Sequence, residues 1–206
     1  MNAIELSHVT KHFPGFTLQD LSLTVPSGTI CGLVGENGAG KSTTIRLLMG
    51  ALRPDSGRCT VLGADSAAPE FLSLKEDIGV VLDEAYFPES LNALQVGGVM
   101  AKTYRRWDGK QYQNYLTRFG LPEKKPFKDF SRGMKMKLAI AVALSHSPRL
   151  LVLDEATAAL DNESEHLVAE SLDKLAAGRT TLTIAHRLTT IQGADRILVL
   201  SGSRIV

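Results

Sequence analysis

The sequence predicts an α/β fold with a mainly parallel sheet, an antiparallel β part at the N-terminus and an inserted helical part. In the first and last parts of the chain, apolar strand-like runs alternate with helix-like stretches, as in parallel sheets that helices cover on both faces. Residues 84–149 between them have mostly helical patterns. The 206 residues suit one domain, in which we expect a core of residues 1–83 and 150–206 around the helical segment 84–149.

The strand patterns are of two kinds. Residues 4–9 and 18–25 alternate apolar and polar side chains, which is typical of half-buried antiparallel strands. Residues 29–35 form a continuous apolar run, which is typical of a strand covered on both faces, and a helix is expected at 40–52. Further strands are expected at 58–63, 78–82, 149–155, 180–186 and 196–200. Further helices are expected at 91–107, 109–121, 131–146 and about 163–177.

Composition and charge exclude several classes of protein. The net charge of +1 gives no overall bias toward nucleic acid or anionic lipid. Neither cysteine, Cys31 or Cys59, belongs to a metal-ligand cluster, so we expect buried thiols in a reducing compartment. The N-terminus lacks the apolar centre of a signal peptide. No apolar run approaches the ~20 residues that a membrane helix requires, so this chain is not expected to span a membrane.

The stretch "GENGAGKS", residues 35–42, fits the pattern G-x-x-x-x-G-K-[ST] at every fixed position. Glycines let successive backbone N–H groups point into one anion-binding hollow, and the following helix adds its positive N-terminal end. Lys41 would reach the β- and γ-phosphates of a nucleotide, and the Ser42 hydroxyl would bind Mg²⁺. The plainer alternative is a glycine turn with a surface lysine. The expected nucleotide-binding residues here are Gly35, Asn37, Gly38, Gly40, Lys41, Ser42 and Thr43.

Two carboxylates follow the apolar run "LLVL", at the carboxyl end of an expected strand, where open α/β sheets bind their ligands. Asp154 would hold Mg²⁺ through water, and Glu155 would orient and polarise an attacking water as a general base. The alternative is a pair of solvated carboxylates at the start of a loop. His186 ends another apolar run, and it is either structural or close enough to sense the γ-phosphate.

The order of the remaining motifs separates the nucleotide-binding families. The chain has no N-K-x-D run, which argues against a GTPase. "FSRGMKMK" precedes "LLVLDEAT", and "ALD" and His186 follow. With "LSLTVPSGTICGLVGENGAGKSTTIRLLMGALRPDSG", this order resembles the ATP-binding subunit of ABC transporters over essentially the whole chain. The resemblance implies a P-loop NTPase fold of the ABC ATPase type.

The resemblance also implies roles for residues outside the glycine-rich stretch. Phe13 matches the aromatic residue that stacks on adenine, Asp161 the D-loop and His186 the switch histidine. Asp83, expected near the metal, stands where the family usually has a glutamine, and the adjacent Glu84 is an alternative occupant. The signature motif matches Ser131, Arg132 and Gly133.

The signature motif is also a helix start. Ser131 is expected to cap a helix whose Met134, Leu138 and Val142 face inward. Arg132 and Met134 depart from the usual Gly and Gln, and Arg132 would add a phosphate contact or narrow the site. The cap and a contact to phosphate are compatible, because a helix N-terminus has free N–H groups.

The family's architecture implies the partners. Each ATP would lie between the glycine-rich loop of one copy and the signature helix of a second copy, so the chain would form a homodimer around ATP and Mg²⁺. A separate transmembrane permease would dock on the helical insertion, through the aromatics Tyr86, Phe87, Tyr104 and Trp107 unless these are core residues. The chain would then be a peripheral protein on the cytoplasmic face of the membrane, with no nucleic acid partner.

Two alternative functions remain open from the sequence. One is a domain that binds ATP and dimerises but hydrolyses ATP poorly, and the other is a soluble ABC-type ATPase acting on DNA or ribosomes. The group of ABC proteins that the sequence resembles also changes along the chain. Up to "LLVLDEAT" it resembles stand-alone ATPase subunits of two-component exporters, and from "ALDNESEH" on it resembles ATPase domains fused to exporters, as in a natural mosaic or a designed chain.

Overall fold

The computed structural model describes residues 1–82, 85–154, 179–184, 191 and 193–206. Their contacts divide the chain into two compact units. The first unit comprises Met1–Lys75 and Gly178–Val206, and the second comprises Glu76–Ala177.

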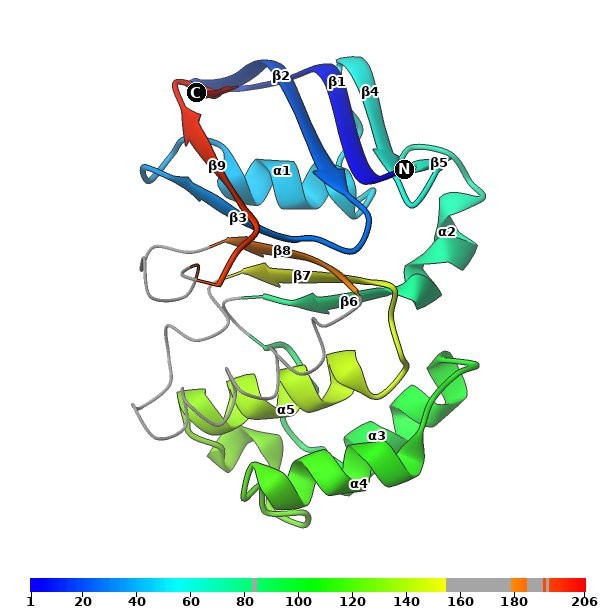
Figure 1. The fold of residues 1–206 in the computed structure, drawn as a ribbon. Coiled ribbons are helices and arrows are strands. Elements are labelled where there is room, and N and C mark those ends of the chain that lie inside the picture. Colours follow the sequence, from blue (N-terminus) through cyan, green and yellow to red (C-terminus); the bar gives the residue numbers. More distant parts are fainter. Residues whose placement is uncertain (83–84, 155–178, 185–190, 192) are drawn as a thin grey trace. The chain divides into compact units, whose positions relative to one another are not determined.

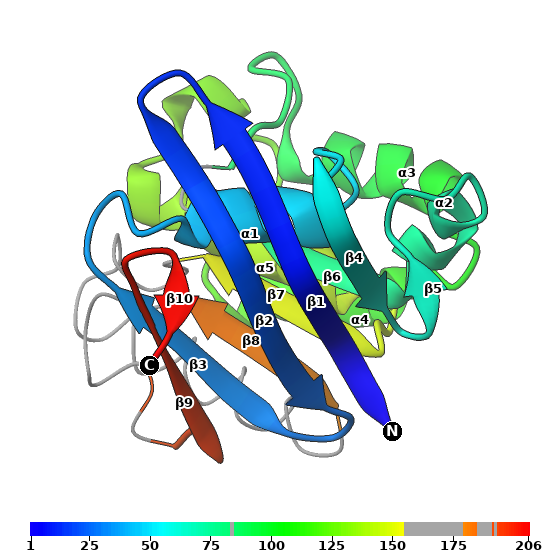
Figure 2. The same ribbon diagram turned by 90° about the horizontal axis from the view of Figure 1, so that it is seen from above.

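The first unit contains an antiparallel sheet in the order β2-β1-β4-β5 (Figures 1 and 2). Its strands are β1 (Asn2–Phe13), β2 (Phe16–Pro26), β4 (Ser56–Val61) and β5 (Ala64–Asp65). β1 and β2 pair along most of their length and are joined by a turn at Pro14 and Gly15. The alternating pattern therefore predicted this hairpin correctly, although both strands are longer than the alternating segments.

The first unit also contains a parallel group of strands centred on β3 (Ile30–Gly35). β3 lies between β8 (Thr180–Ile184) and β9 (Arg196–Ser201) and pairs in parallel with both. The short β10 (Arg204–Ile205) adds antiparallel to β9. The central position of β3 explains its continuous apolar run, because both of its edges are paired and both of its faces need apolar cover.

Helix α1 (Lys41–Leu48) follows β3 and lies between β3 and the antiparallel sheet (Figure 1). Five of its residues are buried: Lys41, Thr44, Ile45, Leu47 and Leu48. The helix ends earlier than residue 52, as Gly50 adopts a left-handed φ of 63°. The N–H groups of Ala51 and Leu52 turn back to the carbonyl of Arg46, which closes the helix end. The short α2 (Phe71–Leu74) was not expected from the sequence.

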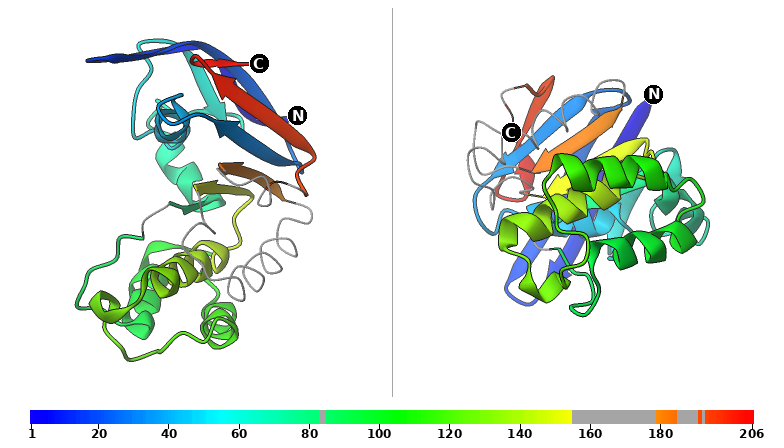
Figure 3. Two further views of the ribbon diagram at one scale, coloured as in Figure 1. Left: turned by 90° about the vertical axis from the view of Figure 1, so that its left-hand side faces the viewer. Right: turned by 90° about the horizontal axis from the view of Figure 1, so that it is seen from below.

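The second unit contains the parallel pair β6 (Ile78–Val81) and β7 (Leu150–Asp154) and three helices. The helices are α3 (Ala93–Thr103), α4 (Gly109–Arg118) and α5 (Arg132–Leu144), and they pack on one another (Figure 3). α5 also packs on β6, so these strands group with the helices. The contacts thus divide the chain near residues 75 and 177, whereas the expected division into 1–83, 84–149 and 150–206 stays a prediction.

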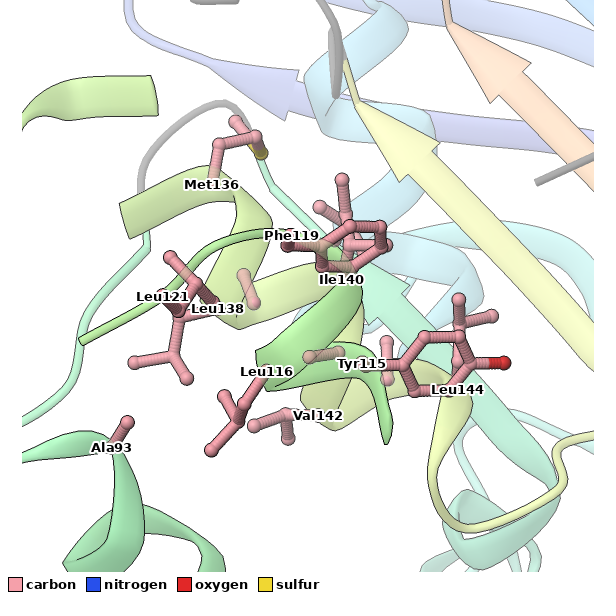
Figure 4. Packing of buried hydrophobic residues seen from close by; sticks show 14 of the residues in the cluster. Ala93, Tyr115, Leu116, Phe119, Leu121, Met136, Leu138, Ile140, Val142 and Leu144 are labelled. Carbon is pink, nitrogen blue, oxygen red and sulfur yellow. The ribbon is translucent and has the colours of Figure 1, made fainter. Parts of the chain in front are cut away.

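The core of the second unit surrounds α5. All residues from 138 to 144 are buried, so this helix is apolar on every side and is covered by its neighbours (Figure 4). Aromatic residues of α4 and of the following segment fill the space around it: Tyr112, Tyr115, Phe119, Phe127 and Phe130. Two of the four aromatic docking candidates pack inward as well: Tyr104 stacks on His146, and Trp107 packs on Tyr112.

Capping residues set the starts of the three helices. Asn92 and Gln95 form a capping box at α3, and Asp108 caps α4. Ser131 caps α5, because its Oγ accepts a hydrogen bond from the N–H of Met134 at 3.2 Å. The cap predicted at Ser131 is therefore confirmed, and Leu138 and Val142 are buried as expected.

The structure tests several further predictions made from the sequence. Both cysteines are buried and free of disulfides, as expected. The strands expected at 58–63, 78–82, 149–155, 180–186 and 196–200 correspond to β4, β6, β7, β8 and β9. The helix expected at about 163–177 lies outside the described residues. Within the part of the chain that the structure describes, no helix is both long and apolar enough to cross a membrane.

Candidate functional site

The loop between β3 and α1, residues 36–40, is a tight turn that only glycine permits at two positions. Ala39 donates its N–H to the carbonyl of Glu36 at 3.1 Å, which closes the turn. Gly38 and Gly40 have φ values of 82° and 107°, in the region that side chains disfavour. At Gly40 a Cβ would also lie 2.7 Å from Leu18 Cδ1, so the Leu18 side chain would have to shift to admit any side chain there. We call residues 36–40 the glycine loop.

Lys41 places its charge inside the glycine loop. The residue is only 7% exposed, and its Nζ donates hydrogen bonds to the carbonyls of Gly35 at 2.6 Å and Glu36 at 2.9 Å. The ammonium is thus held over the turn rather than extended into solvent as a surface lysine would be. This geometry disfavours the alternative of a glycine turn with a surface lysine.

The start of α1 is available to an anion. Its N-cap residue is Gly40, which has no side chain to bond the N–H groups of the first turn. Thr44 is buried and donates its hydroxyl to the carbonyl of Gly40 at 2.9 Å, so it stabilises the loop from within. Ser42 is exposed and Thr43 is half-buried, so both hydroxyls remain near the surface of the loop. Free N–H groups at a positive helix end next to a lysine form a phosphate-binding arrangement.

An aromatic pair lies beside the glycine loop. Phe13 is half-buried at the end of β1, and its ring stacks on Phe16 with centroids 6.3 Å apart and an interplanar angle of 27°. Phe16 Cζ in turn lies 3.2 Å from the position of a Cβ at Gly40. The family resemblance indicated Phe13 but not Phe16, although the run "FPGF" places two aromatics on either side of a turn. We call residues 11–18, which carry both rings, the aromatic tip.

The second unit carries the other expected site residues that the structure describes. Asp154 is half-buried at the carboxyl end of β7. Ser131 and Arg132 are exposed at the start of α5, and Gly133 is half-buried there. Because the Ser131 oxygen accepts from Met134, its hydroxyl proton remains available to donate to an approaching oxygen.

The two halves of the expected site belong to different units. Phe13 and the glycine loop lie in the first unit, and Asp154 and the start of α5 lie in the second. The structure describes each half by itself. The remaining expected site residues lie outside the described residues: Asp83, Glu84, Glu155, Asp161 and His186.

The donor set suits Mg²⁺ rather than a metal held by a full protein cage. Among the described residues, no group of three or more His, Cys, Asp or Glu side chains is placed to hold a metal ion. The expected donors are the Ser42 hydroxyl and the carboxylates of Asp83 and Asp154, all oxygen ligands, of which Asp83 lies outside the described residues. Mg²⁺ typically keeps several waters and binds through few protein oxygens plus substrate phosphates, so donors of this chemistry suit it.

Comparison with known proteins gives a consistent result. The family model described as ABC transporter matches residues 18–158. The chain is 36% identical over 219 residues to "ATP-binding cassette sub-family B member 10, mitochondrial" of Mus musculus, a match that covers 98% of this chain and 31% of that protein. It is 35% identical over 215 residues to "ATP-dependent lipid A-core flippase" of Psychrobacter arcticus, covering 98% of this chain and 36% of that protein. The chain thus spans about a third of the length of these two relatives.

Solved structures agree with the sequence matches. "Structure of a bacterial Atm1-family ABC exporter with ATP bound" superposes with a TM-score of 0.88 at 29% identity, covering all of this chain and 38% of that chain. "Structure of ATP binding subunit of ABC transporter" has the same TM-score at 25% identity and covers 98% of this chain and 88% of that chain. The fold matches a part of one protein and nearly the whole of the other.

Proposed function

The chain belongs to the ABC transporter family and is an ATPase, and we propose that it drives a membrane transporter through ATP-dependent dimerisation. The observation that carries this proposal is the glycine loop, where Lys41 is buried against the loop carbonyls beside an uncapped helix start. A positive charge and unbonded N–H groups in one hollow favour a polyphosphate.

ATP would bind to the first unit through its phosphates and its base. The N–H groups of the glycine loop and of the first turn of α1 would cradle the phosphates, with Lys41 leaving the carbonyls to reach the β- and γ-phosphates. Gly35, Asn37, Gly38, Gly40, Ser42 and Thr43 complete this set of contacts. The adenine ring would stack on Phe13, whose partner Phe16 touches the loop.

Hydrolysis would use the residues at the ends of the parallel strands. Mg²⁺ held by Ser42 and Asp154, with Asp83 nearby, would neutralise charge on the phosphates. Glu155 would take a proton from the attacking water as the water oxygen bonds to the γ-phosphorus. The bond from that phosphorus to the bridging oxygen breaks, and ADP and phosphate leave. His186 would contact the γ-phosphate.

A second copy of the chain would close the site. The start of α5 offers the hydroxyl proton of Ser131, the backbone of Gly133 and the exposed guanidinium of Arg132 at a positive helix end. A γ-phosphate bound in one copy would attract this end of the other copy, and Asp161 would line the contact between them. Two-fold symmetry would then give two ATP sites per dimer.

The second unit also contains a groove suited to a protein partner. Its cavity volume is about 380 Å³, and its lining includes Tyr86, Phe87, Phe127, Arg132, Lys135 and Met136. Tyr86 is 78% exposed there, whereas Phe87 packs edge-on against Phe127. Of the four aromatic docking candidates, Tyr86 is therefore the one we assign to the docking surface, and the other three are packed within the unit.

The partner at this groove would be the transmembrane part of the transporter. The expectation from the sequence is a separate permease chain, which would place this chain at the cytoplasmic face of the membrane. The alternative is a transmembrane part within one longer protein that contains this chain. Co-purification from membranes with an affinity tag on this chain distinguishes a separate permease from a larger single polypeptide.

The variant Glu155→Gln tests the proposed cycle. Without the base, bound ATP is not hydrolysed, so the dimer should persist. Light scattering should show the molecular mass doubling only when ATP and Mg²⁺ are present, while the parent chain hydrolyses ATP and stays mostly monomeric. A variant that binds ATP yet remains monomeric would contradict dimerisation through the start of α5.

A domain that binds ATP and dimerises with little turnover is the second candidate. The exposed Arg132 at the start of α5, where relatives usually have glycine, favours it, because a bulky cation there would hold the phosphates after hydrolysis. Steady-state kinetics of the parent and of Arg132→Gly separate the two. A large gain in the rate on removing the side chain would favour the slow-turnover domain.

A further inference from the structure

We propose that Asp55 is a positioning residue for ATP binding: it anchors the aromatic tip beside the glycine loop. This inference rests on the proposed function, since it assigns the aromatic tip to the nucleotide base. Asp55 lies in the turn "RPDSG" before β4, far from the glycine loop in sequence, and no motif assigns a role to it.

The aromatic tip extends past the edge of the three-stranded part of the sheet. β1 pairs with β4 from Ile4 to Ser7 and last at Thr10, opposite Ser56. Beyond Thr10, β1 pairs with β2 alone, at Lys11, His12 and Phe13. A two-stranded hairpin by itself is only marginally stable in water. The Ser203 hydroxyl supports its β2 side by donating to the carbonyl of Thr17 at 2.9 Å. The β1 side, which carries Phe13, needs support from another segment.

Asp55 supplies that support with its backbone and its side chain together. Its N–H donates to the carbonyl of Thr10 at 2.8 Å, which extends the ladder by one bond. Its Oδ2 then accepts the N–H of His12 at 2.8 Å, in place of the carbonyl that a longer β4 would provide. Its Oδ1 accepts from Lys11 Nζ at 2.7 Å, and Oδ2 also lies 3.1 Å from His12 Nδ1.

These bonds converge on the two residues that directly precede Phe13. Lys11 and His12 are therefore fixed in position, and with them the strand end from which the Phe13 ring projects. The hydrogen bond from Lys11, followed by those from His12, also holds the pKa of the Asp55 carboxyl well below its usual range. The carboxylate is thus ionised, and able to accept all these bonds, at any pH at which ATP is present as a polyanion.

The tip in turn contacts the glycine loop through its second strand. Phe16 and Leu18 are the residues closest to the position of a Cβ at Gly40. The Phe13 ring, on which the base would stack, is here called the base platform. A shift of the tip would therefore move the base platform relative to the phosphate site, while leaving the phosphate site itself assembled. Loss of Asp55 should then weaken the binding of a molecule with a base and spare a molecule that has phosphates alone.

The control is Asp65, a second aspartate with a similar set of bonds. It accepts from Arg58 Nε at 3.2 Å and from the N–H of Ala67 at 2.9 Å, and it belongs to the same antiparallel sheet at β5. Both aspartates are at the surface, where ion pairs contribute little to stability, so Asp55→Ala and Asp65→Ala should unfold at similar temperatures. A stability effect alone would act on both variants.

The experiment measures ATPase kinetics of the parent, Asp55→Ala, Asp55→Asn and Asp65→Ala, with inorganic tripolyphosphate as a competitor that lacks a base. Complete loss of a base–aromatic stack corresponds to a roughly 5- to 150-fold loss of affinity. For a platform that is loosened rather than removed, we expect KM for ATP to rise about fivefold in Asp55→Ala, at the low end of that range. We expect kcat to stay within about twofold and the inhibition constant of tripolyphosphate to be unchanged, since neither depends on the base platform.

Asp55→Asn should give an intermediate KM, because its amide oxygen still accepts from His12 while the charge opposite Lys11 is lost. Amide hydrogen exchange of residues 11–16 should become faster in Asp55→Ala and not in Asp65→Ala. Equal KM values in Asp55→Ala and Asp65→Ala would overturn the proposal, as would a parallel loss of ATP and tripolyphosphate binding or unchanged exchange in the tip. A parent chain that binds no ATP would instead overturn the proposed function.

Discussion

Gly40 allows the sharpest test of how the glycine loop is built. Replacement by alanine acts in two ways: the backbone φ of 107° becomes strained, and the new Cβ would lie 2.7 Å from Leu18 Cδ1 and 3.2 Å from Phe16 Cζ. Strain at such a conformation costs about 1–3 kcal/mol, and overpacking costs a further ~1–3 kcal/mol. The free energy of unfolding should therefore fall by about 2–6 kcal/mol in Gly40→Ala.

Gly38→Ala is the matched control, because it isolates the first of these effects. Gly38 has a similarly positive φ of 82°, but nothing lies within 4 Å of the position of its Cβ. Its loss of stability should be only the conformational part, about 1–3 kcal/mol. Urea unfolding followed by circular dichroism measures both variants, and adding Leu18→Val to Gly40→Ala should restore part of the lost stability. Equal losses in the two alanine variants, or no rescue by Leu18→Val, would refute the packing argument.

Three further predictions concern other parts of the chain. Ser131→Ala should lower the free energy of unfolding by about 1 kcal/mol through loss of the α5 cap. Ser131→Asp should keep the cap but abolish the ATP-dependent doubling of molecular mass in light scattering, because its carboxylate repels phosphate. Tyr112→Phe should lower the free energy of unfolding by about 1–2 kcal/mol, since the Ala93 carbonyl loses the hydrogen bond that the Tyr112 hydroxyl donates at 2.7 Å; a urea midpoint equal to that of the parent would contradict this. Burial raises the pKa of the Cys59 thiol to about 11. The stability that the buried neutral thiol contributes is therefore complete below the ordinary thiol pKa and is lost as pH rises from there toward 11. Urea midpoints of the parent should fall over that pH window more steeply than those of Cys59→Ala.

Much of this fold could be predicted from short sequence patterns, because residues close together in sequence determine these strands and caps. The alternation of residues 4–9 and 18–25 indicated an antiparallel hairpin, and β1 and β2 form one. The apolar run at 29–35 indicated a doubly covered strand, and β3 has parallel neighbours on both sides. The Ser131 cap was predictable as well, because a cap involves residues only three positions apart.

Contacts between distant segments were not predictable in the same way. Phe16 and Leu18 approach Gly40 across more than twenty residues of sequence, and no spacing rule connects them. The aromatic candidates show the same limit: Tyr104 stacks on His146 with centroids 4.0 Å apart, while Tyr86 is exposed, although both are tyrosines in the helical segment. The anchoring of the tip by Asp55 depends on where β4 stops pairing with β1, and the sequence around Asp55 reads only as a turn.

The burial of α5 on all sides limits how the second unit can move. Ser131, Arg132 and Gly133 stand at the end of a helix whose residues 138–144 are all enclosed by the core. Such a helix cannot slide or rotate alone, because any shift would open voids among tightly packed side chains. A force applied to its first turn is therefore transmitted to the elements that pack on α5, namely α3, α4 and β6. A contact as small as one phosphate at this helix start would in this way act on all of these elements at once.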